Sequence, residues 1–352
     1  MKQHLERLIK AFPKNLDAIL LTSPVNRLYV SGFDASDDMI LVTPESSYFL
    51  ADGRYIEEVR NKVPFMTSIL ATDFYDTLRE LISKHNIKTL GFEDMEITVF
   101  RYNRLKNELN VELNPIGSLM FELRKRKTPD EVSKMTWAQA IADRAFSYIL
   151  NIIKPGMTER EVMLTLREYY VRQGSEGDSF EPIVVSGKNS SLPHGLPSDK
   201  VIERGDFITM DFGCVVQHYR SDMTRTIAVG YATDEMRKVY DIVLEAQKAA
   251  LSGIHSGMTG AECDKIARDI IDNAGYKDCF GHGLGHSVGL EIHEPPRFSP
   301  RSTDIIEAGT VMTVEPGVYF EGAFGVRIED MVLMTQNGCE NFTKSKKELI
   351  IL

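Results

Sequence analysis

The feature that most constrains this fold is an internal repeat in the second half of the chain. Residues 155–174 read PGMTEREVMLTLREYYVRQG, and residues 256–275 read SGMTGAECDKIARDIIDNAG. In both segments a threonine is followed three residues later by a glutamate, the pattern of a capping box at the start of a helix. Both segments end on a glycine, which is typical of a helix end. The repeat therefore predicts the same helix twice.

Strand-like segments extend the repeat. The matching pairs are GDFITMDFG with GTVMTVEPG (205–213 and 309–317) and RSDMT with RIEDM (220–224 and 327–331). The alignment places Asp211 opposite Glu315, and Asp222 opposite Glu329. We expect two related modules of helix and sheet. Each module would present one carboxylate at the end of an apolar strand and a second carboxylate one hairpin later.

These four carboxylates lie in segments that are otherwise strongly apolar, and burying any of them as an unpaired charge is unfavourable. Glu329 is expected on one continuous strand, FGVRIEDMVLM, with Arg327 two residues away and on the same face. In two pseudo-symmetric modules the carboxylates would meet, and like charges that close ionise together only when cations lie between them. Oxygen ligands together with imidazole suit divalent Mn, Co or Zn.

Three of the eight histidines, His282, His286 and His293, lie within GHGLGHSVGLEIHE (281–294). Such a segment is either a glycine loop that binds phosphate or a set of imidazoles that bind a metal and carry protons. The GxGxxG spacing, the lysine of a P-loop and a downstream acidic partner for ribose are all missing from it. The histidines are therefore interpreted together with the carboxylates.

The first third of the chain alternates strand-like and helix-like segments, which predicts an α/β domain. The strands are expected in DAILLT, MILVTP, SYFLAD and KTLGFE, and the helices in FYDTLRELISKHN and TVFRYNRLKNEL. Thr128, followed by Pro129, Asp130 and Glu131, is a strong helix start. A chain of 352 residues is long for one core, so we place a domain boundary between residues 122 and 123.

Composition argues against several classes of partner. The formal net charge is −10, whereas binding to nucleic acid or to anionic membranes needs a basic face. The four cysteines are widely spaced without a CxxC pair, which argues against a zinc knuckle or a disulfide framework. We find no apolar signal segment at the N-terminus and no apolar run near the ~20 residues of a spanning helix. We expect a cytoplasmic protein.

The motifs PHGLPSD, YRSDMTRT, GHGLGH, HEPP, TVEPGVY and GVRIED, in this order within residues 123–350, resemble those of the metallopeptidases that share the pita-bread fold. Within this family they are most similar to Xaa-Pro aminopeptidases and Xaa-Pro dipeptidases (prolidases). ADGRY (51–55) resembles the creatinase-type N-terminal domain. The resemblance implies a creatinase-type α/β domain at residues 1–122. It implies an α+β pita-bread catalytic domain, a duplicated helix-and-sheet unit, at residues 123–352.

The resemblance also implies that the chain is a metallo-exopeptidase with two divalent metal ions. Manganese is the preferred metal, with cobalt or zinc as the alternatives. The substrate would be the Xaa-Pro bond at the N-terminus of peptides or in dipeptides. A water between two such ions is hydroxide-like near neutral pH and would attack the peptide carbonyl. The implied metal ligands are Asp211, Asp222, His286, Glu315 and Glu329, and Glu315 is also the implied general base.

Further roles follow from the resemblance alone. His194 and His293 would contact the substrate and stabilise the tetrahedral intermediate or carry a proton, and His282 would line the pocket. Arg327 would orient a ligand carboxylate. Arg297, in HEPPR, either grips the C-terminal carboxylate of a dipeptide or is a solvated loop residue.

Two positions depart from the family pattern, which commonly has glycine where this chain has His218 and Ser287. Neither position is an implied ligand. At His218 we expect the hairpin to turn differently from its relatives.

Three alternative functions stay open. A methionine-type aminopeptidase would use the same ligands but normally lacks the N-terminal domain and the HExP-type sequence. A creatinase-like enzyme or a non-catalytic binding protein on this fold would be expected to lose ligands, whereas all five positions are filled here. The family also implies a homodimer.

Overall fold

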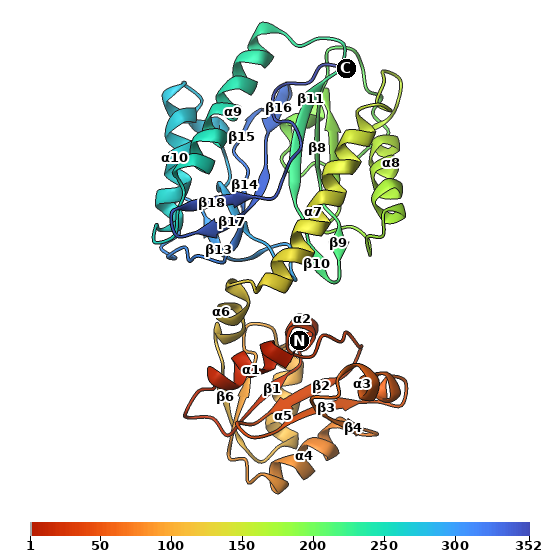
Figure 1. Ribbon diagram of the computed structural model, residues 1–352, viewed down its shortest axis with the longest axis vertical. Helices are drawn as coiled ribbons and strands as arrows, with labels where there is room; N and C mark the ends of the chain where they lie inside the picture. Colours follow the sequence, from red (N-terminus) through yellow and green to blue (C-terminus); the bar gives the residue numbers. More distant parts are fainter. Residues whose placement is uncertain (1) are drawn as a thin grey trace. The chain divides into compact units, whose positions relative to one another are not determined.

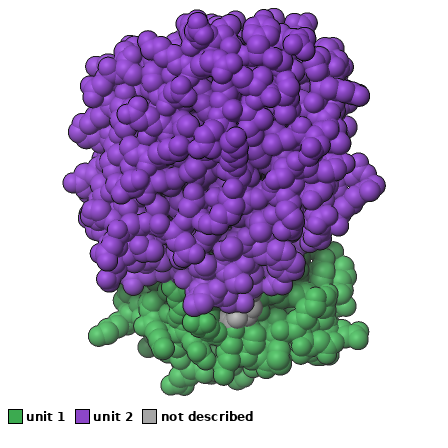
Figure 2. All heavy atoms as spheres, turned by 45° about the horizontal axis from the view of Figure 1, so that its top comes forward, with its two compact units in different colours: residues 1–124 green, residues 125–352 purple. Residues whose placement is uncertain are grey.

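The computed structural model describes residues 2–352, and the chain forms two compact units, Met1–Arg124 and Lys125–Leu352 (Figure 2). The sequence placed a domain boundary between residues 122 and 123. Whether two domains that fold independently meet at this boundary stays a prediction. Each unit has its own sheets and its own buried clusters.

Unit 1 is built on one mixed six-stranded sheet (Figure 1). In sheet order its strands are β4 (Thr67–Leu70), β3 (Ser47–Ala51), β2 (Met39–Val42), β1 (Ala18–Leu21), β5 (Thr89–Phe92) and β6 (Glu112–Pro115). The four expected strands are confirmed as β1, β2, β3 and β5. The outer strands β4 and β6 were not predicted, because their side chains are half-buried or exposed and neither strand carries the apolar run of a central strand.

The helices that follow or precede these strands are α1 (Lys2–Lys10), α2 (Pro24–Ser31), α3 (Ile56–Lys62), α4 (Phe74–Lys84), α5 (Val99–Glu108) and α6 (Leu119–Lys125). The two expected helices are confirmed as α4 and α5. Each begins after a residue whose side chain accepts a hydrogen bond from the first turn, Asp73 for α4 and Thr98 for α5. Leu78 of α4 shares a buried cluster with Leu20 and Leu50 of the sheet.

Unit 2 contains two helix pairs, α7 (Pro129–Ile149) with α8 (Glu159–Arg172), and α9 (Asp234–Gly253) with α10 (Gly260–Asn273). The helix start expected at Thr128 is confirmed as the capping box of α7. The repeated helix is confirmed as α8 and α10, which Thr158 and Thr259 cap in matching capping boxes. After the two helix ends, Gly174 and Gly275 adopt left-handed φ values of 92° and 94°.

The strands of unit 2 form two antiparallel sheets and two small hairpins. The first sheet has the order β11 (Met223–Ala228), β8 (Phe207–Phe212), β7 (Ile183–Ser186). The second has the order β13 (Glu294–Phe298), β12 (Gly285–Ser287), β14 (Val311–Val314), β17 (Asp330–Thr335), β18 (Gly338–Asn341). The hairpins are β9 (Val215–Val216) with β10 (Tyr219–Arg220) and β15 (Gly317–Phe320) with β16 (Phe324–Arg327). Strand, hairpin and strand therefore follow one another in both modules, as the repeat predicted.

Each module has its own buried cluster between helices and sheet. Phe146 of α7 and Met210 of β8 belong to the first cluster, and Val243 of α9 and Met312 of β14 belong to the second. The two helix pairs lie on the outside of unit 2, with the sheets between them (Figure 1). Within residues 2–352, we find no helix that is both long enough and apolar enough to cross a membrane.

One strand prediction is wrong. The segment FGVRIEDMVLM is not one continuous strand, because β16 ends at Arg327 and β17 begins at Asp330. The partner changes at this point, since β16 pairs with β15 and β17 pairs with β14. Glu329 lies in the connection between the two sheets, so the argument that alternation puts it on the same face as Arg327 does not hold.

Candidate metal centre

The four predicted carboxylates lie at the ends of matching strands in the two modules. Asp211 is the last residue but one of β8, and Asp222 directly precedes β11, which pairs with β8 so that Thr224 lies opposite Asp211. Glu315 directly follows β14, and Glu329 directly precedes β17, which pairs with β14. The duplication thus places the carboxylates as two equivalent pairs.

His286 joins the carboxylates from β12, the neighbour of β14. Its Nε2 atom lies 3.4 Å from Glu315 Oε1 and 3.7 Å from Asp222 Oδ2. Ligand atoms of Asp222, His286 and Glu329 lie within 4.8 Å of one another, close enough to hold a metal ion. All five predicted ligands line one cavity of about 400 Å³ in unit 2.

The carboxyl groups are buried and crowded. Burial, followed by the charges of Glu329 and Asp211, raises the pKa of Asp222 well above its ordinary value. Burial and the charge of Glu315 raise the pKa of Glu329 in the same way. Burial raises the pKa of Glu315 to about 8, against the lowering effect of Arg327. A cation among these groups would allow them to ionise together.

The His286 ring gives a second reason to place a cation here. Burial lowers the pKa of His286 to about 3, so the imidazole is neutral and carries one proton. Its Nδ1 atom lies 3.2 Å from the carbonyl oxygen of Ser287, which can only accept a hydrogen bond, so Nδ1 carries the proton. Nε2 therefore presents a lone pair to the carboxylate oxygens of Asp222 and Glu315. A metal ion between them would accept the lone pairs of Nε2 and of the carboxylate oxygens. Histidine usually binds metals as the neutral imidazole.

Asp211 supplies a third observation. The Arg327 guanidinium donates a hydrogen bond to its Oδ2 atom over 2.6 Å. Its Oδ1 atom is buried and has no hydrogen-bond partner among residues 2–352. A buried carboxylate oxygen in this state is unfavourable unless an ion or a water contacts it. The oxygen donors, the neutral imidazole and this open oxygen together fit divalent metal ions.

The residues predicted to face the substrate lie around the same cavity. His194, His282, His293 and Arg297 all line it, as does Arg327. The rings of His293 and His286 meet edge to face, with centroids 4.4 Å apart. Burial lowers the pKa of His293, with a smaller contribution from Arg297, so this ring is neutral near pH 7. The structure thus brings together every residue that the sequence assigned to the site.

Arg297 lies on β13, directly opposite His286 of β12. It is therefore an exposed strand residue and not a loop residue, which corrects one of its two interpretations. Arg297 lines the same cavity as the five predicted ligands.

Two threonines that were not predicted from the sequence form hydrogen bonds with two of the predicted ligands. Thr224 Oγ1 donates to Glu329 Oε2 over 2.7 Å, and Thr313 Oγ1 donates to Glu315 Oε1 over 3.0 Å. Thr224 stands two residues after Asp222, and Thr313 stands two residues before Glu315. This spacing puts neighbouring side chains of a strand on one face, so the sequence did contain a signal for both.

Tyr319 was also missed, and it forms a hydrogen-bonded pair with His282. The Tyr319 hydroxyl lies 2.9 Å from His282 Nε2 and accepts a hydrogen bond from Arg327 Nη1. His282 Nδ1 lies 2.8 Å from the carbonyl oxygen of Gly283 and carries the ring proton, so the hydroxyl donates to Nε2. Burial lowers the pKa of His282 to about 4, with a smaller contribution from Arg327, and the ring stays neutral.

Comparison with known proteins agrees with this geometry and confirms the predicted family and fold class. Residues 133–336 match the model of metallopeptidase family M24, and residues 4–126 match that of the creatinase/prolidase N-terminal domain. The Xaa-Pro dipeptidase of Pyrococcus furiosus is 39% identical over 361 residues, which cover 99% of this chain and 100% of the relative. The structure of an Xaa-Pro dipeptidase from Bacillus anthracis is similar with a TM-score of 0.97 at 42% identity, over 99% of both chains. That of an X-Pro aminopeptidase from Thermotoga maritima is similar with a TM-score of 0.93 at 35% identity, over 99% of both chains. The chain therefore belongs to metallopeptidase family M24 and carries an N-terminal domain of the creatinase/prolidase type.

Proposed function

We propose that this chain is an exopeptidase that depends on two divalent metal ions and hydrolyses the Xaa-Pro bond, at the N-terminus of peptides or in Xaa-Pro dipeptides. The observation that carries the proposal is the convergence of four strand-end carboxylates and one neutral imidazole on a single cavity. Relatives whose names state Xaa-Pro dipeptidase or X-Pro aminopeptidase activity support the proline specificity.

The proposed ligands of the two ions are Asp211, Asp222, His286, Glu315 and Glu329. Four carboxylates and one imidazole suit a metal that accepts mostly oxygen ligands, which favours manganese over cobalt or zinc. When bound, the ions supply Lewis acidity to the scissile carbonyl and to the attacking water.

Glu315 is the proposed general base. Its carboxylate accepts a hydrogen bond from Thr313 and lies beside the His286 ring, so its position is fixed. From this position it takes a proton from the attacking water and returns it to the leaving proline nitrogen. His194 and His293 are proposed to contact the substrate carbonyl, where a ring N–H stabilises the negative charge that develops on the oxygen.

The cavity lining supports a proline at the scissile bond. The Xaa-Pro amide is tertiary and has no N–H, so peptidases that hydrogen-bond this group fail on it. Phe180, Ile183 and Ile292 line the cavity and offer apolar contact to a pyrrolidine ring. His282 adds a flat ring whose two nitrogens are already engaged in hydrogen bonds within the chain.

Arg297 is proposed to bind the C-terminal carboxylate of a dipeptide. It lines the cavity opposite His286, and among residues 2–352 no carboxylate forms an ion pair with it. Arg297→Ala is then expected to raise KM for Ala-Pro and to leave KM for Ala-Pro-Ala unchanged. An equal change of KM for both substrates would show that Arg297 does not bind the dipeptide carboxylate.

Two further proposals concern the state of the protein. We expect a homodimer, as the family resemblance implies. We also expect the cytoplasm as its compartment, since Cys214, Cys263, Cys279 and Cys339 are all free thiols, as is usual where the environment is reducing.

One assay series tests the proposed function. The protein is stripped of metal with a chelator, restored with Mn, Co or Zn, and assayed on Ala-Pro, Ala-Pro-Ala, Met-Ala-Ser and creatine. We expect activity on one or both proline substrates, lost on stripping and restored by Mn. Activity on Met-Ala-Ser alone would identify a methionine-type aminopeptidase, and activity on creatine a creatinase-like enzyme. Full activity after complete chelation would refute the metal-dependent mechanism.

A further inference from the structure

The C-terminal segment, residues 343–352, contacts both modules of unit 2 (dark blue in Figure 1). In the first module, the backbone N–H of Ser345 donates to Asp143 of α7 over 2.8 Å, and Ile351 forms a parallel bridge with Ala228 of β11. Contacts to the second module come from the side chain of Lys347, which reaches α9 and β17. The segment thus joins the two halves of the duplicated unit.

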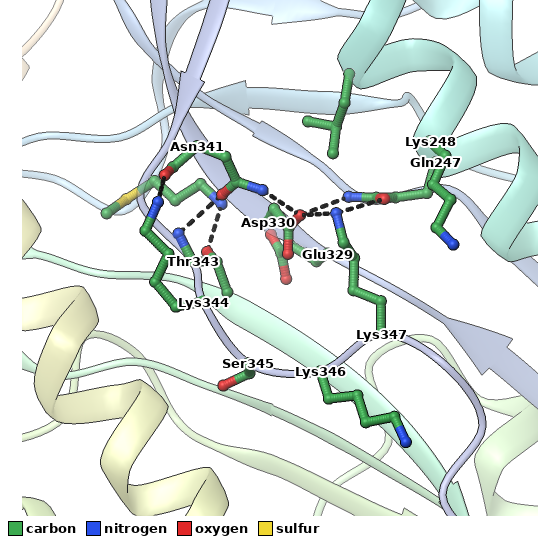
Figure 3. Close-up of polar contacts among 12 residues, drawn as sticks. Gln247, Lys248, Glu329, Asp330, Asn341, Thr343, Lys344, Ser345, Lys346 and Lys347 are labelled. Carbon is green, nitrogen blue, oxygen red and sulfur yellow. Dashed lines mark hydrogen bonds and ion pairs between the residues drawn. The ribbon is translucent and has the colours of Figure 1, made fainter.

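Asp330, at the start of β17, is the buried carboxylate to which this segment is attached (Figure 3). Its Oδ2 atom accepts hydrogen bonds from Lys347 Nζ at 2.6 Å, Asn341 Nδ2 at 2.6 Å and Gln247 Nε2 at 2.9 Å. Its Oδ1 atom accepts from Arg225 Nη2 at 2.8 Å. The Asp330 side chain is 0% exposed and that of Lys347 is 19% exposed. Four donors from four different parts of the unit therefore fix one carboxylate.

Arg225 makes the second connection to the segment, and all five of its N–H groups are used. Nε and Nη2 donate to the carbonyl oxygens of Lys346 and Ser345 over 3.0 Å and 2.8 Å. Nη2 also donates to Asp330, and Nη1 donates to the carbonyl oxygen of the preceding residue. Nη1 also donates to the carbonyl oxygen of Glu329 over 2.6 Å.

Glu329 is consequently held by its backbone as well as by its side chain. Its N–H donates to the carbonyl oxygen of Thr224 over 3.1 Å, and its own carbonyl oxygen accepts from Arg225. Its carboxylate accepts from Thr224 Oγ1. The next residue in the chain is Asp330, which accepts a hydrogen bond from Lys347 Nζ over 2.6 Å. The C-terminal segment is therefore connected to Glu329, one of the proposed metal ligands, although Lys347 does not line the cavity.

We propose that Lys347 is a positioning residue for Glu329. By fixing Asp330, Lys347 holds the Glu329 carboxylate in place for the metal. The inference rests on the proposed function, in which Glu329 is a ligand. A ligand that is already in place loses little conformational freedom when the ion binds, whereas a mobile one loses more and binds more weakly. Side chains that orient metal ligands from outside typically contribute about 10–100-fold in metal affinity.

The test compares Lys347→Met with the wild type by titrating the metal-free protein with Mn²⁺ in a calorimeter. We expect the Mn²⁺ affinity to fall about 10–100-fold in Lys347→Met and to recover largely in Lys347→Arg. KM for Ala-Pro at saturating Mn²⁺ should stay unchanged, because Lys347 does not contact the substrate. The matched control is Lys248→Met, which removes an exposed cation that pairs with Glu348 of the same segment over 3.3 Å. Its Mn²⁺ affinity should equal that of the wild type.

A purely structural role for Lys347 predicts a different result. In that case Lys347→Met lowers the melting temperature of the metal-free protein but leaves the Mn²⁺ affinity unchanged, and this outcome would overturn the proposal. Should Lys347→Met fail to fold, Lys347→Gln, which keeps a donor on a neutral side chain, provides the same comparison. The titration is repeated with Co²⁺ and Zn²⁺, and if the wild type binds none of the three ions, both the proposed function and the inference fail. Wild-type binding with equal affinity in the variants removes the inference alone.

Discussion

Arg327 of the second module donates a 2.6 Å hydrogen bond to Asp211 of the first, so the candidate metal centre is joined across the duplication by one arginine. The same guanidinium donates to Thr224 Oγ1 over 3.0 Å and to the Tyr319 hydroxyl over 2.9 Å. Its Nη1 atom also donates to the carbonyl oxygen of Pro193 over 3.2 Å, and four acceptors in different directions suit the planar fork of an arginine better than the three donors of an ammonium group. Arg327 therefore orients Asp211, a proposed ligand, together with Thr224 and Tyr319.

Replacement of Arg327 should weaken metal binding. In Arg327→Met, Asp211 keeps its buried position but loses the cation that fixes it, and we expect the Mn²⁺ affinity to fall about 10–100-fold. Arg327→Lys restores the charge without the fork and should recover only part of the loss. Calorimetric titration of the metal-free proteins measures the effect. An unchanged Mn²⁺ affinity in Arg327→Met would show that Asp211 is held without it.

The metal-free protein should lose stability as the pH rises from about 6.5 to 8. Glu315 has an ordinary pKa of 4.5 that burial raises to about 8, and the pKa values of Asp222 and Glu329 are raised as well. Above pH 4.5 the unfolded chain releases these protons before the folded chain does, so the free energy of unfolding falls with rising pH until the folded groups have also ionised. His286 opposes this trend only below its ordinary pKa of 6.5, because burial lowers its pKa to about 3.

Urea denaturation of the metal-free protein across this pH range checks the prediction. Mn²⁺ binding has to displace the same protons, so the affinity should rise with pH up to about 8 and protons should be released. Glu315→Gln removes one of the titrating groups and should make the stability less dependent on pH. A free energy of unfolding that rises between about pH 6.5 and 8 would contradict the raised carboxyl pKa values.

Tyr319→Phe should affect substrate binding more than catalysis. The change removes the donor to His282 Nε2 and leaves Arg327 bonded to Asp211, so His282 loses its fixed orientation while the ligands keep theirs. Loss of one such hydrogen bond corresponds to about 1 kcal/mol, or roughly a 5-fold increase in KM for Ala-Pro. Tyr276→Phe, a half-buried tyrosine that packs on Phe320, is the matched control. A fall in kcat with KM unchanged would instead place His282 in the chemical step.

The residues of the candidate metal centre could be inferred from the sequence because short local patterns reveal the duplication. The capping boxes at Thr158 and Thr259 mark the same helix in the two modules, and the match of residues 205–213 with residues 309–317 pairs Asp211 with Glu315. The glycine before His286 also follows a physical requirement, since a Cβ at that position would lie 2.1 Å from a carbonyl oxygen of β14. Local capping, strand alternation and close approach are all properties that neighbouring residues determine.

The supporting contacts could not be predicted, because they join residues that are far apart in the chain. Lys347 lies in the polar C-terminal segment and Asp330 lies in the apolar segment FGVRIEDMVLM, and only the fold brings the two side chains together. At His218 the family pattern, which commonly has glycine there, does not by itself predict the conformation of the turn. Gln217 and His218 both have left-handed φ values, 47° and 70°, as in the type I′ turn of a two-residue hairpin, which normally takes glycine or asparagine. Whether relatives turn differently at His218 stays a prediction.

The last prediction concerns the buried ion pair between Lys127 and Glu294. Lys127, just before α7, donates to Glu294 Oε2 over 3.2 Å and to Ser287 Oγ over 3.1 Å, and the Lys127 and Glu294 side chains are 1% and 2% exposed. Ser287 follows His286 and Glu294 follows His293, so one lysine holds the segments that carry two histidines of the site. Ser287, where the family commonly has glycine, provides this lysine with a hydroxyl.

Removal of Lys127 should destabilise the fold strongly, because a buried carboxylate then loses its cation. Lys127→Met is expected to lower the free energy of unfolding by about 3–5 kcal/mol, and Ser287→Ala by about 1 kcal/mol. In the double variant Lys127→Met with Glu294→Gln, both charges are absent, so the loss should be smaller than the sum of the two single losses. Urea denaturation of the metal-loaded proteins measures the single variants Lys127→Met, Glu294→Gln and Ser287→Ala and the double variant. Strict additivity would mean that Lys127 and Glu294 do not stabilise each other and that Lys127 acts by packing alone.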